Sequence, residues 1–459
     1  MPTPLLPLIQ TAIDVAVPFQ LEDAAFVARH KRVVVGHKTG LGKTFISLLA
    51  WSQWSDVRRV LIVGTSAAMN TWRRVLRQWG GAEVFPMKGI SDPDWKLLLN
   101  KRQSGIWTCT YATFRLLMAD TPGKVPIDLF ITDELHKALR NRTTTWKAMM
   151  RVDSTYYIGA TATWASKGPQ DLYPVLHYID KSLFPSYWRF VETWCHVADA
   201  SYGKEIFGVR NADKLKALLH SRYYRTRTWK EVGSQFLHRS LEEEPVIRRS
   251  EIIPMSSEQL AIYNGMVNAK EARWDKDFIL AQNSLDQLTK SLQLALSPQL
   301  LFPTAPVGGP VEWLTSKLLE LDSAVVFLPF KPLASICGKF LKANGYERPM
   351  YNLYGGVTPD DCDATITAWR KTKGVVFCTI SYAQSFPLDE TDYAYMLGFD
   401  WDPNNNIQAE GRLRRFDSNF TCPCLVTYIV PEDSEYYKVR EVINGKVSNV
   451  KQVLAGYGL

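Results

Sequence analysis

Short apolar runs that alternate with longer amphipathic stretches constrain the fold of this chain more than any other feature. Such runs lie at residues 32–35, 60–63, 106–109, 129–131 and 156–158, and again at 324–328, 375–378, 393–397 and 425–429. Apolar runs of this length, separated by helical patterns, are typical of parallel sheets covered by helices. The sequence therefore predicts an α/β fold with two doubly wound parallel-sheet lobes.

Residues 172–301 interrupt this alternation with aromatic and basic stretches that read as helices, and a charged segment, LEEEP, begins at residue 241. A chain of 459 residues can hold two or three domains. We expect a first lobe at residues 1–240, with a helical insert at about 172–235. Linker helices and the second lobe are expected at residues 241–459.

Composition sets limits on the partners and on the compartment. The net charge of +8 suits a partner with a phosphate backbone but does not by itself establish one. The seven cysteines lack the paired spacing of a zinc site, which is typical of reduced thiols inside a cell. The N-terminus lacks the parts of a signal peptide, and no apolar run is long enough to span a membrane. We expect a cytoplasmic protein without membrane association.

The segment GHKTGLGKT at residues 36–44 lies between an apolar run and a helical stretch, the context of a phosphate-binding loop. Thr39, Gly40, Leu41 and Gly42 would bring backbone N–H groups to the phosphates, and Lys43 would neutralise their charge. The Thr44 hydroxyl would bind Mg²⁺. His37 stands where the usual pattern has glycine. Read alone, the segment is also compatible with a glycine turn beside a surface lysine.

Two further segments follow apolar runs of the first lobe. LFITDELH at residues 129–136 ends in Asp133, a candidate Mg²⁺ ligand, and Glu134, a candidate base for the attacking water. Read alone, this Asp-Glu pair could equally begin a surface helix. GATATW at residues 159–164 offers small hydroxyl residues that could link the nucleotide site to a nucleic-acid track. A tight polar turn is the alternative.

The segment QAEGRLRR at residues 408–415 lies in the predicted second lobe. Helical spacing puts Gln408, Arg412 and Arg415 on one face. Two guanidinium groups on one face suit the spread charge of a transferring phosphoryl group. A solvated basic helix is the alternative. If the segment faces a nucleotide held by the first lobe, hydrolysis depends on closure of the two lobes.

These four segments, in this order, resemble superfamily 2 helicases and translocases, and the resemblance covers nearly the whole chain. The nearest resemblance is to the Swi/Snf-like group, to which GLGKT, DELHKALRNRTTTW and DWDPNNNIQAEGRLRR are similar. The resemblance implies two RecA-like lobes and an ATP hydrolase that uses ATP and Mg²⁺. It also adds His136 to the catalytic set and Gln20, in Pro-Phe-Gln, as a contact to adenine.

The resemblance also implies where nucleic acid would bind. Thr65, with Arg73 nearby, corresponds to one motif of the first lobe, and Thr110 with Tyr111 corresponds to another. In the second lobe, the candidate contacts are Lys331 and Thr379, with Gln384 as a further candidate for a nucleotide or backbone contact in a segment that departs from the family pattern. Trp188 and Trp194 of the insert could stack on bases at a duplex junction, although core packing is the commoner role of tryptophan.

Together these features predict an ATP-dependent DNA translocase or helicase that acts on double-stranded, forked or junction DNA with weak sequence specificity. The insert segment CHVADASYGKEIFGVRN resembles the fork-remodelling branch, which implies branch migration, unwinding, and work with replication or recombination proteins in DNA repair. No histone-reading segment is evident, so we expect a bacterial protein, or a phage protein acting in the host cytoplasm. The alternatives are an RNA helicase of the same superfamily and the motor subunit of a nuclease complex.

Overall fold

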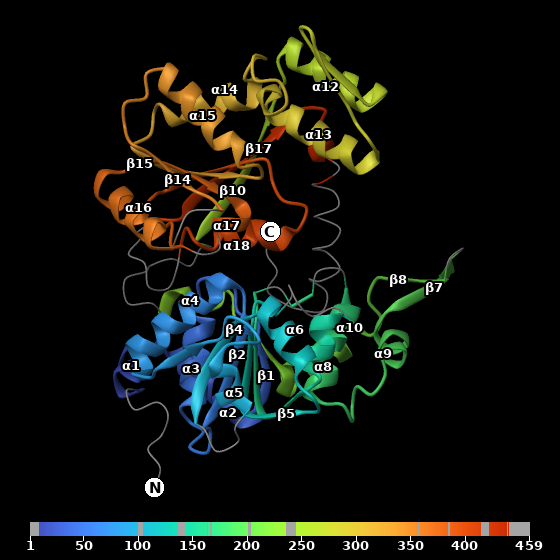
Figure 1. Ribbon diagram of the computed structural model, residues 1–459, viewed down its shortest axis with the longest axis vertical. Helices are drawn as coiled ribbons and strands as arrows, with labels where there is room; N and C mark the ends of the chain where they lie inside the picture. Colours follow the sequence, from blue (N-terminus) through green and yellow to red (C-terminus); the bar gives the residue numbers. More distant parts are fainter. Residues whose placement is uncertain are drawn as a thin grey trace. The chain divides into compact units, whose positions relative to one another are not determined.

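The computed structural model of the chain describes residues 9–99, 104–135, 143–162, 164–165, 168–200, 203–235, 245–355, 359–383, 386–414, 422–437 and 439 (Figure 1). The chain divides into two compact units, of which one includes Met1–Glu242 and the other is Glu243–Gly445. The domain boundary predicted after residue 240 lies in 236–244, outside the described residues. No helix of the described part is long and apolar enough to cross a membrane.

A seven-stranded parallel sheet forms the centre of the first unit, with the strand order β3-β4-β2-β5-β6-β1-β9. The strands are β1 (Arg32–Val35), β2 (Arg59–Gly64), β3 (Val84–Pro86), β4 (Gly105–Thr110), β5 (Val125–Asp133), β6 (Val152–Ala160) and β9 (Tyr224–Arg225). All five apolar runs predicted as strands in this half are confirmed. The sequence reading missed β3 and β9 because they are too short to form an apolar run.

Helices lie on both faces of this sheet. They include α1 (Ile9–Val15), α2 (Pro18–His30), α3 (Lys43–Trp51), α4 (Ser66–Val75), α5 (Pro93–Leu99), α6 (Tyr111–Asp120) and α7 (Thr144–Met149). The chain moves in one direction along the sheet from β1 through β2 to the edge strand β3, and returns through β4, β5 and β6. Right-handed crossovers therefore put α3 and α4 on one face and α6 and α7 on the other. Trp107, Phe130 and Tyr157 are fully buried in the core of this unit.

The insert of the first unit was predicted to be helical, and this is wrong in part. It contains α8 (Tyr173–Ile179), α9 (Tyr187–Trp194), α10 (Ala212–Leu218) and the short α11 (Trp229–Val232). Between α9 and α10 it forms an antiparallel hairpin of β7 (His196–Ala200) and β8 (Gly203–Phe207). Figure 1 shows the hairpin extending beyond α9. Its alternating residues give no continuous apolar run, because most of its side chains are exposed.

The second unit is built on a six-stranded parallel sheet with the order β10-β17-β16-β13-β15-β14. The strands are β10 (Val246–Ile253), β13 (Ser323–Leu328), β14 (Met350–Leu353), β15 (Gly374–Thr379), β16 (Tyr393–Leu397) and β17 (Cys424–Pro431). All four apolar runs predicted as strands are confirmed. The edge strand β10 was missed, because charged and exposed residues interrupt its sequence, VIRRSEII.

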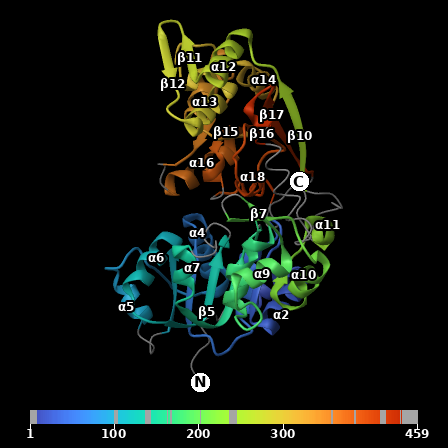
Figure 2. The same ribbon diagram turned by 90° about the vertical axis from the view of Figure 1, so that its right-hand side faces the viewer.

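The helices of this unit are α12 (Ser257–Ala269), α13 (Ser284–Leu296), α14 (Gly309–Leu318), α15 (Pro332–Ala343), α16 (Pro359–Thr372), α17 (Ile380–Ala383) and α18 (Pro403–Glu410). A second hairpin, β11 (Glu271–Trp274) and β12 (Asp277–Leu280), lies next to α12 (Figure 2). The core of the unit includes Phe327, Met396 and the fully buried Trp369, whose indole donates to the Gly374 carbonyl at 3.1 Å. The prediction of two parallel-sheet lobes is confirmed.

Candidate functional site

Most of the segments singled out in the first lobe begin at the same edge of its sheet. Because every strand pair is parallel, the carboxyl ends of the strands all lie at this edge. β1 runs into the GHKTGLGKT loop, β5 ends at Asp133, and β6 ends at Ala160 before Thr161. β2 and β4 lead into Thr65 and Thr110. The register confirms the proximity of these ends, since Asp133 pairs with Ala160 and Gly64 with Thr110.

The loop between β1 and α3 has the backbone that phosphate binding requires. Gly40 and Gly42 have φ angles of 83° and 78°, a region that favours glycine. Gly42 is the N-cap of α3, so Lys43 and Thr44 are the first residues of that helix and lie at its positive end. Both side chains are half-buried, and the Lys43 ammonium donates to the His37 carbonyl at 3.1 Å. The Leu41 side chain is buried beneath the loop.

His37, the residue that departs from the usual loop pattern, belongs to a buried polar network. Its Nε2 lies 2.8 Å from Asp23 Oδ2, and both side chains are fully buried. Asp23 also accepts hydrogen bonds from Arg225 and, at 3.1 Å, from Arg227, and both arginines bridge to Glu22 as well. This network joins α2, the phosphate loop and the segment after β9.

The charge states within this network follow from its geometry. Burial by itself would raise the pKa of Asp23, but the hydrogen bonds from His37, Arg227 and Arg225 lower that pKa to about 2. Burial lowers the pKa of His37 more than the neighbouring Asp23 raises it. His37 is therefore neutral and donates its Nε2–H to an ionised Asp23, whose charge the two arginines balance.

The segment Tyr224–Trp229, which comprises β9 and the residues after it, forms a wall against the phosphate loop. The sequence did not predict this role. Gly36 donates to the Arg225 carbonyl at 2.8 Å, and the Thr226 hydroxyl donates back to Gly36 at 2.8 Å. The Trp229 indole donates to the Thr39 carbonyl at 3.0 Å. A Cβ atom at Gly36 would lie 2.1 Å from the Tyr224 ring. Position 36 thus accepts only glycine unless the Tyr224 ring is displaced.

Gln20, for which the resemblance implies a contact to adenine, lies beside the loop. Its side chain is buried in α2, and its Nε2 reaches the Leu41 carbonyl at 3.5 Å. Its Oε1 accepts from the Val17 backbone at 3.2 Å, so the amide also ties down the start of its own helix.

Asp133 is a buried carboxylate at the end of β5. Its Oδ2 accepts from the Trp72 indole of α4 at 2.8 Å, and its Oδ1 accepts from the Glu134 backbone at 2.9 Å. Burial and the Glu134 charge raise its pKa to about 6, while Trp72 and Lys43 oppose that rise. Trp72 also contributes to this site, which the sequence did not predict. It lies in α4, the helix that follows the neighbouring strand β2.

Glu134 has a φ angle of 54°, a left-handed conformation that non-glycine residues rarely adopt. The Tyr111 hydroxyl donates to the Asp133 carbonyl at 2.9 Å and thereby supports this turn. Tyr111 is also a predicted nucleic-acid contact, and its hydroxyl is engaged with the acidic pair. His136 lies outside the described residues.

The donor set at this edge fits Mg²⁺. Each oxygen of Asp133 accepts one hydrogen bond, so each keeps a lone pair for a cation, and Thr44 adds a hydroxyl oxygen at the start of α3. Carboxylate and hydroxyl oxygens are the ligands that Mg²⁺ prefers. The positive charge of Lys43 lowers the pKa of Asp133, so the phosphate loop lies close enough to the acidic pair for their charges to interact.

Thr65 is the N-cap of α4 and Thr110 is the N-cap of α6. The strands that lead into these helices, β2 and β4, are neighbours in the sheet. The Thr65 hydroxyl accepts from the Ala68 backbone at 3.3 Å at the start of α4, and Thr110 accepts from Thr113 at 3.2 Å at the start of α6. Two helix N-termini, both able to bind anions, therefore lie next to each other at the carboxyl edge of the sheet. Arg73 lies on α4, two turns beyond Thr65.

The arginine segment of the second unit departs from its predicted geometry. α18 ends at Glu410, so Arg412 lies in the turn after the helix rather than on a continuous helical face with Gln408. Gln408 is buried and Arg412 is half-buried. Arg415 lies outside the described residues. Hydrogen bonds from Arg412 to the Ala409 carbonyl and from Leu413 to the Glu410 carbonyl show that the backbone tightens into turns after Glu410.

Two ion pairs, each with one buried partner, hold this segment in place. Glu410 is buried and accepts from Arg248 of β10 at 2.7 Å and from the Tyr428 hydroxyl of β17 at 2.6 Å. Arg414 is also buried, and it donates to the Thr391 carbonyl at 2.8 Å and to Asp392 at 2.6 Å. Of the three arginines in GRLRR, the middle one is thus a packing residue of the second unit.

The remaining candidates of the second unit are partly engaged within the protein. The Lys331 ammonium lies 4.5 Å from the centre of the Tyr354 ring and donates to the Gly355 carbonyl at 3.3 Å. Thr379 is buried at the end of β15. Gln384 lies outside the described residues.

The two tryptophans of the insert differ in exposure. Trp188 is 42% exposed, and the Lys204 ammonium lies 5.5 Å from its ring. Trp194 packs against the core of the first unit. Of the two, only Trp188 presents a ring face that could stack on a base.

Comparison with known proteins adds family relationships. A family profile described as "Type III restriction enzyme, res subunit" matches residues 10–166. A SWI/SNF-related matrix-associated actin-dependent regulator of chromatin subfamily A-like protein 1 from Drosophila melanogaster is 20% identical, over 97% of this chain and 56% of its own length. The protein of the same name from Xenopus tropicalis is 24% identical, over 87% of this chain and 41% of its own length. The chain spans about half the length of these relatives.

Protein CHROMATIN REMODELING 4 of Arabidopsis thaliana is 20% identical over 84% of this chain and 18% of its own length. Among solved structures, the Sulfolobus solfataricus SWI2/SNF2 ATPase core in complex with dsDNA is 16% identical, with a TM-score of 0.45. That alignment covers 99% of this chain and the whole of the other chain.

The network around Asp23 predicts a pH dependence of stability. The pKa of Asp23 is about 2 in the folded protein, below the value of 3.8 expected in the unfolded chain. Ionised Asp23 therefore stabilises the fold fully above pH 3.8. This stabilisation is lost as the pH falls through 2. Asp23→Asn should lower the free energy of unfolding at pH 7 by about 2 kcal/mol or more. Urea unfolding at several pH values measures this, and the difference from the parent should narrow toward pH 2. A difference that is independent of pH contradicts the assignment.

Proposed function

Because this chain is a superfamily 2 ATPase of the Swi/Snf-like group, we propose that it couples ATP hydrolysis to movement along double-stranded or branched DNA. The observation that carries the proposal is the shared carboxyl edge of the first sheet. This edge brings a phosphate loop, a buried acidic pair and two adjacent helix N-termini together. A nucleotide and a nucleic-acid backbone can therefore be bound by one rigid sheet.

We assign the nucleotide to the loop of Thr39–Thr44, with Gln20 beside the adenine. Lys43 neutralises the β- and γ-phosphates, and the backbone N–H groups at the start of α3 bind their oxygens. Thr44 and Asp133 would hold Mg²⁺, which would add positive charge near the phosphate oxygens. Glu134 orients the attacking water and accepts its proton, and His136 joins these residues from the same segment.

Gln408, Arg412 and Arg415 are proposed to act on the same nucleotide from the second unit. Their guanidinium groups would stabilise the charge that develops on the γ-phosphoryl group. The Glu410 and Arg414 ion pairs support this assignment, since they fix the backbone on both sides of Arg412. Hydrolysis would then require closure of the two units, and this requirement is what converts a chemical step into movement.

The DNA is proposed to lie along the N-termini of α4 and α6, capped by Thr65 and Thr110, with Arg73 alongside. Tyr111, the first residue of α6, would also contact the DNA, and Lys331 and Thr379 would supply contacts from the second unit. Contacts of this kind reach sugar and phosphate, so sequence specificity should be weak. Fork remodelling, branch migration and a link to replication or recombination proteins are part of the proposal; they rest on the resemblance of the insert segment CHVADASYGKEIFGVRN and on the exposed Trp188. We expect the protein to act in the cytoplasm of a bacterium or an infected host cell.

One comparison tests this proposal most directly. The rate of ATP hydrolysis is measured without nucleic acid and with single-stranded, duplex, forked and four-way-junction DNA and with RNA. Duplex or branched DNA should stimulate the rate most, because the proposed backbone contacts lie at the same edge of the sheet as the nucleotide site. Greater stimulation by RNA would replace the proposal with an RNA helicase.

A second candidate function is favoured by the family profile, whose description refers to a subunit of a restriction enzyme. In that case the chain would be the motor of a nuclease complex, and a partner would cleave the DNA. Purification with a nuclease subunit and ATP-dependent cleavage by the pair would support this candidate. Junction unwinding by the isolated chain would favour the first.

Trp72 should contribute to turnover through a single hydrogen bond. Trp72→Phe keeps the buried ring but removes the donor to Asp133, so kcat should fall about 10- to 100-fold, the equivalent of a hydrogen bond to a charged group. Trp107→Phe is the matched control, because Trp107 is equally buried and its indole nitrogen has no hydrogen-bond partner among the described residues. Equal kcat values for Trp72→Phe and Trp107→Phe would show that the hydrogen bond from Trp72 has no role in turnover.

Glu134→Gln separates nucleotide binding from hydrolysis. The amide keeps the size of the side chain but cannot accept the proton of water, so turnover should fall at least about 100-fold while ATP still binds. Lys43→Ala should instead lose both properties, because it removes a phosphate-bound charge. Binding of a fluorescent ATP analogue and phosphate release measure the two effects. Normal turnover by Glu134→Gln excludes Glu134 as the base.

A further inference from the structure

The helix that begins at Thr65 carries an unusual row of cations on its outer face. No acidic residue occurs between Thr65 and Ala82. α4 continues into a π-helical turn, η1 (Leu76–Gly80), and Trp72 and Leu76 are buried on its inner face. A helical period places the outer face opposite them. That face presents Asn70, Arg73, Arg74, Arg77 and Gln78.

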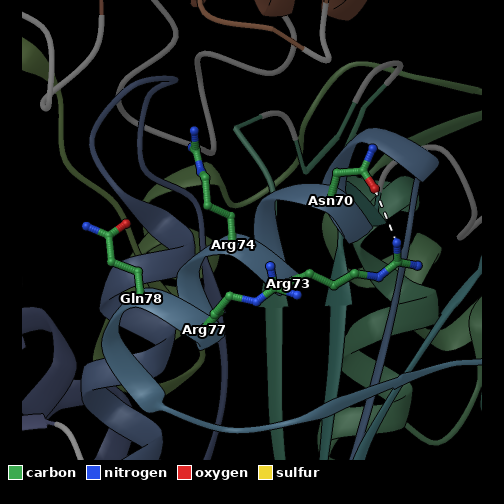
Figure 3. A pocket seen from close by; sticks show the side chains of 5 residues that line it. All are labelled: Asn70, Arg73, Arg74, Arg77 and Gln78. Atoms are coloured by element: carbon green, nitrogen blue, oxygen red, sulfur yellow. Dashed lines mark hydrogen bonds between the residues drawn. The ribbon is translucent and has the colours of Figure 1, made fainter. Parts of the chain in front are cut away.

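These five side chains line a pocket of about 390 Å³ on the surface of the first unit (Figure 3). Arg73 donates to the Asn70 amide oxygen at 3.4 Å, while its Nε is buried and has no hydrogen-bond partner among the described residues. Within the described part of the chain, neither Arg73 nor Arg77 has a carboxylate within 4 Å. Arginines at i and i+4 repel each other. An anionic ligand would relieve this repulsion.

We propose that this row, Asn70, Arg73, Arg74, Arg77 and Gln78, binds the sugar-phosphate backbone of duplex DNA as a second contact beyond the helix N-termini. The inference rests on the function proposed above. The guanidinium fork matches phosphate oxygens, and the two amides supply further donors to phosphate or sugar oxygens.

The position of the row defines which part of the DNA it binds. α4 follows β2, so it runs from the carboxyl edge of the sheet back toward the amino edge. Residues 70–78 extend about 12 Å along the axis, at about 1.5 Å per residue. A duplex advances about 3.4 Å per nucleotide along each strand, so this length holds more than one phosphate. The row therefore extends the DNA-binding surface down the side of the lobe.

The salt dependence of binding tests this proposal. The affinity for a short blunt duplex is measured by fluorescence anisotropy over a range of KCl concentrations. In Arg73→Gln/Arg77→Gln, the slope of log K against log salt should become less negative by about 1.8, since each lost phosphate contact contributes about 0.9. Arg73→Lys/Arg77→Lys keeps both charges and should keep the slope. The single variant Arg77→Gln should change it by about 0.9.

The matched control removes two cations from the opposite edge of the same sheet. Arg29 ends α2 before β1, and Arg58 precedes β2, so Arg29→Gln/Arg58→Gln lowers the net charge equally without touching the row. Its slope should equal that of the parent. Thermal unfolding of each variant verifies the fold, and the single variant serves as the test if the double variant does not fold.

Each other outcome has a defined meaning. If the parent binds duplex DNA but the glutamine variants keep its slope, the row is overturned, Arg73 included, and the other DNA contacts of the proposed function stand. Equal slope changes in the row and control variants also overturn it, as does tighter binding of the parent to duplex RNA. A parent that neither binds duplex DNA nor is stimulated by it contradicts the proposed function itself.

Discussion

Parallel strand pairing is the constraint on which the rest of the first unit depends. A parallel sheet sends every strand out at the same edge, so residues far apart in sequence, such as Lys43, Asp133 and Thr65, begin their loops and helices side by side. No single segment supplies a nucleotide site or a nucleic-acid track. The sheet combines them, and the second unit repeats the same architecture with its own arginine segment.

Buried carboxylates then fix the conformations of the loops, which strand order alone does not determine. Asp23, held ionised by two arginines and a neutral histidine, ties α2 to the phosphate loop. Asp133 is held by a tryptophan donor, and Glu410 by an arginine and a tyrosine. Unpairing a buried charge is costly, so each of these carboxylates restricts its loop to one arrangement. The left-handed Glu134 is tolerated because Tyr111 and Asp133 both hold its peptide in place.

The strands of both sheets could be predicted, since a fully buried parallel strand is apolar throughout. Edge strand β10 and the two hairpins could not, because their exposed faces interrupt the apolar pattern. Local motifs identified Lys43, Asp133 and Gln20. The partners that hold them, Trp72, Arg225 and Arg227, lie far away in sequence and became visible only in three dimensions. His37 looked like a departure from a loop pattern until Asp23 was seen beside it.

The wall formed by Tyr224 through Trp229 has a consequence for the order in which the protein is made. The phosphate loop leaves the ribosome well before its packing partners, which are encoded nearly 190 residues later. Domains fold as units during synthesis, so the loop must wait for almost the whole first unit to emerge. A fragment that stops short of Tyr224 is therefore a sheet without a finished nucleotide loop. The loop can therefore reach its final packing only after Trp229 has been synthesised.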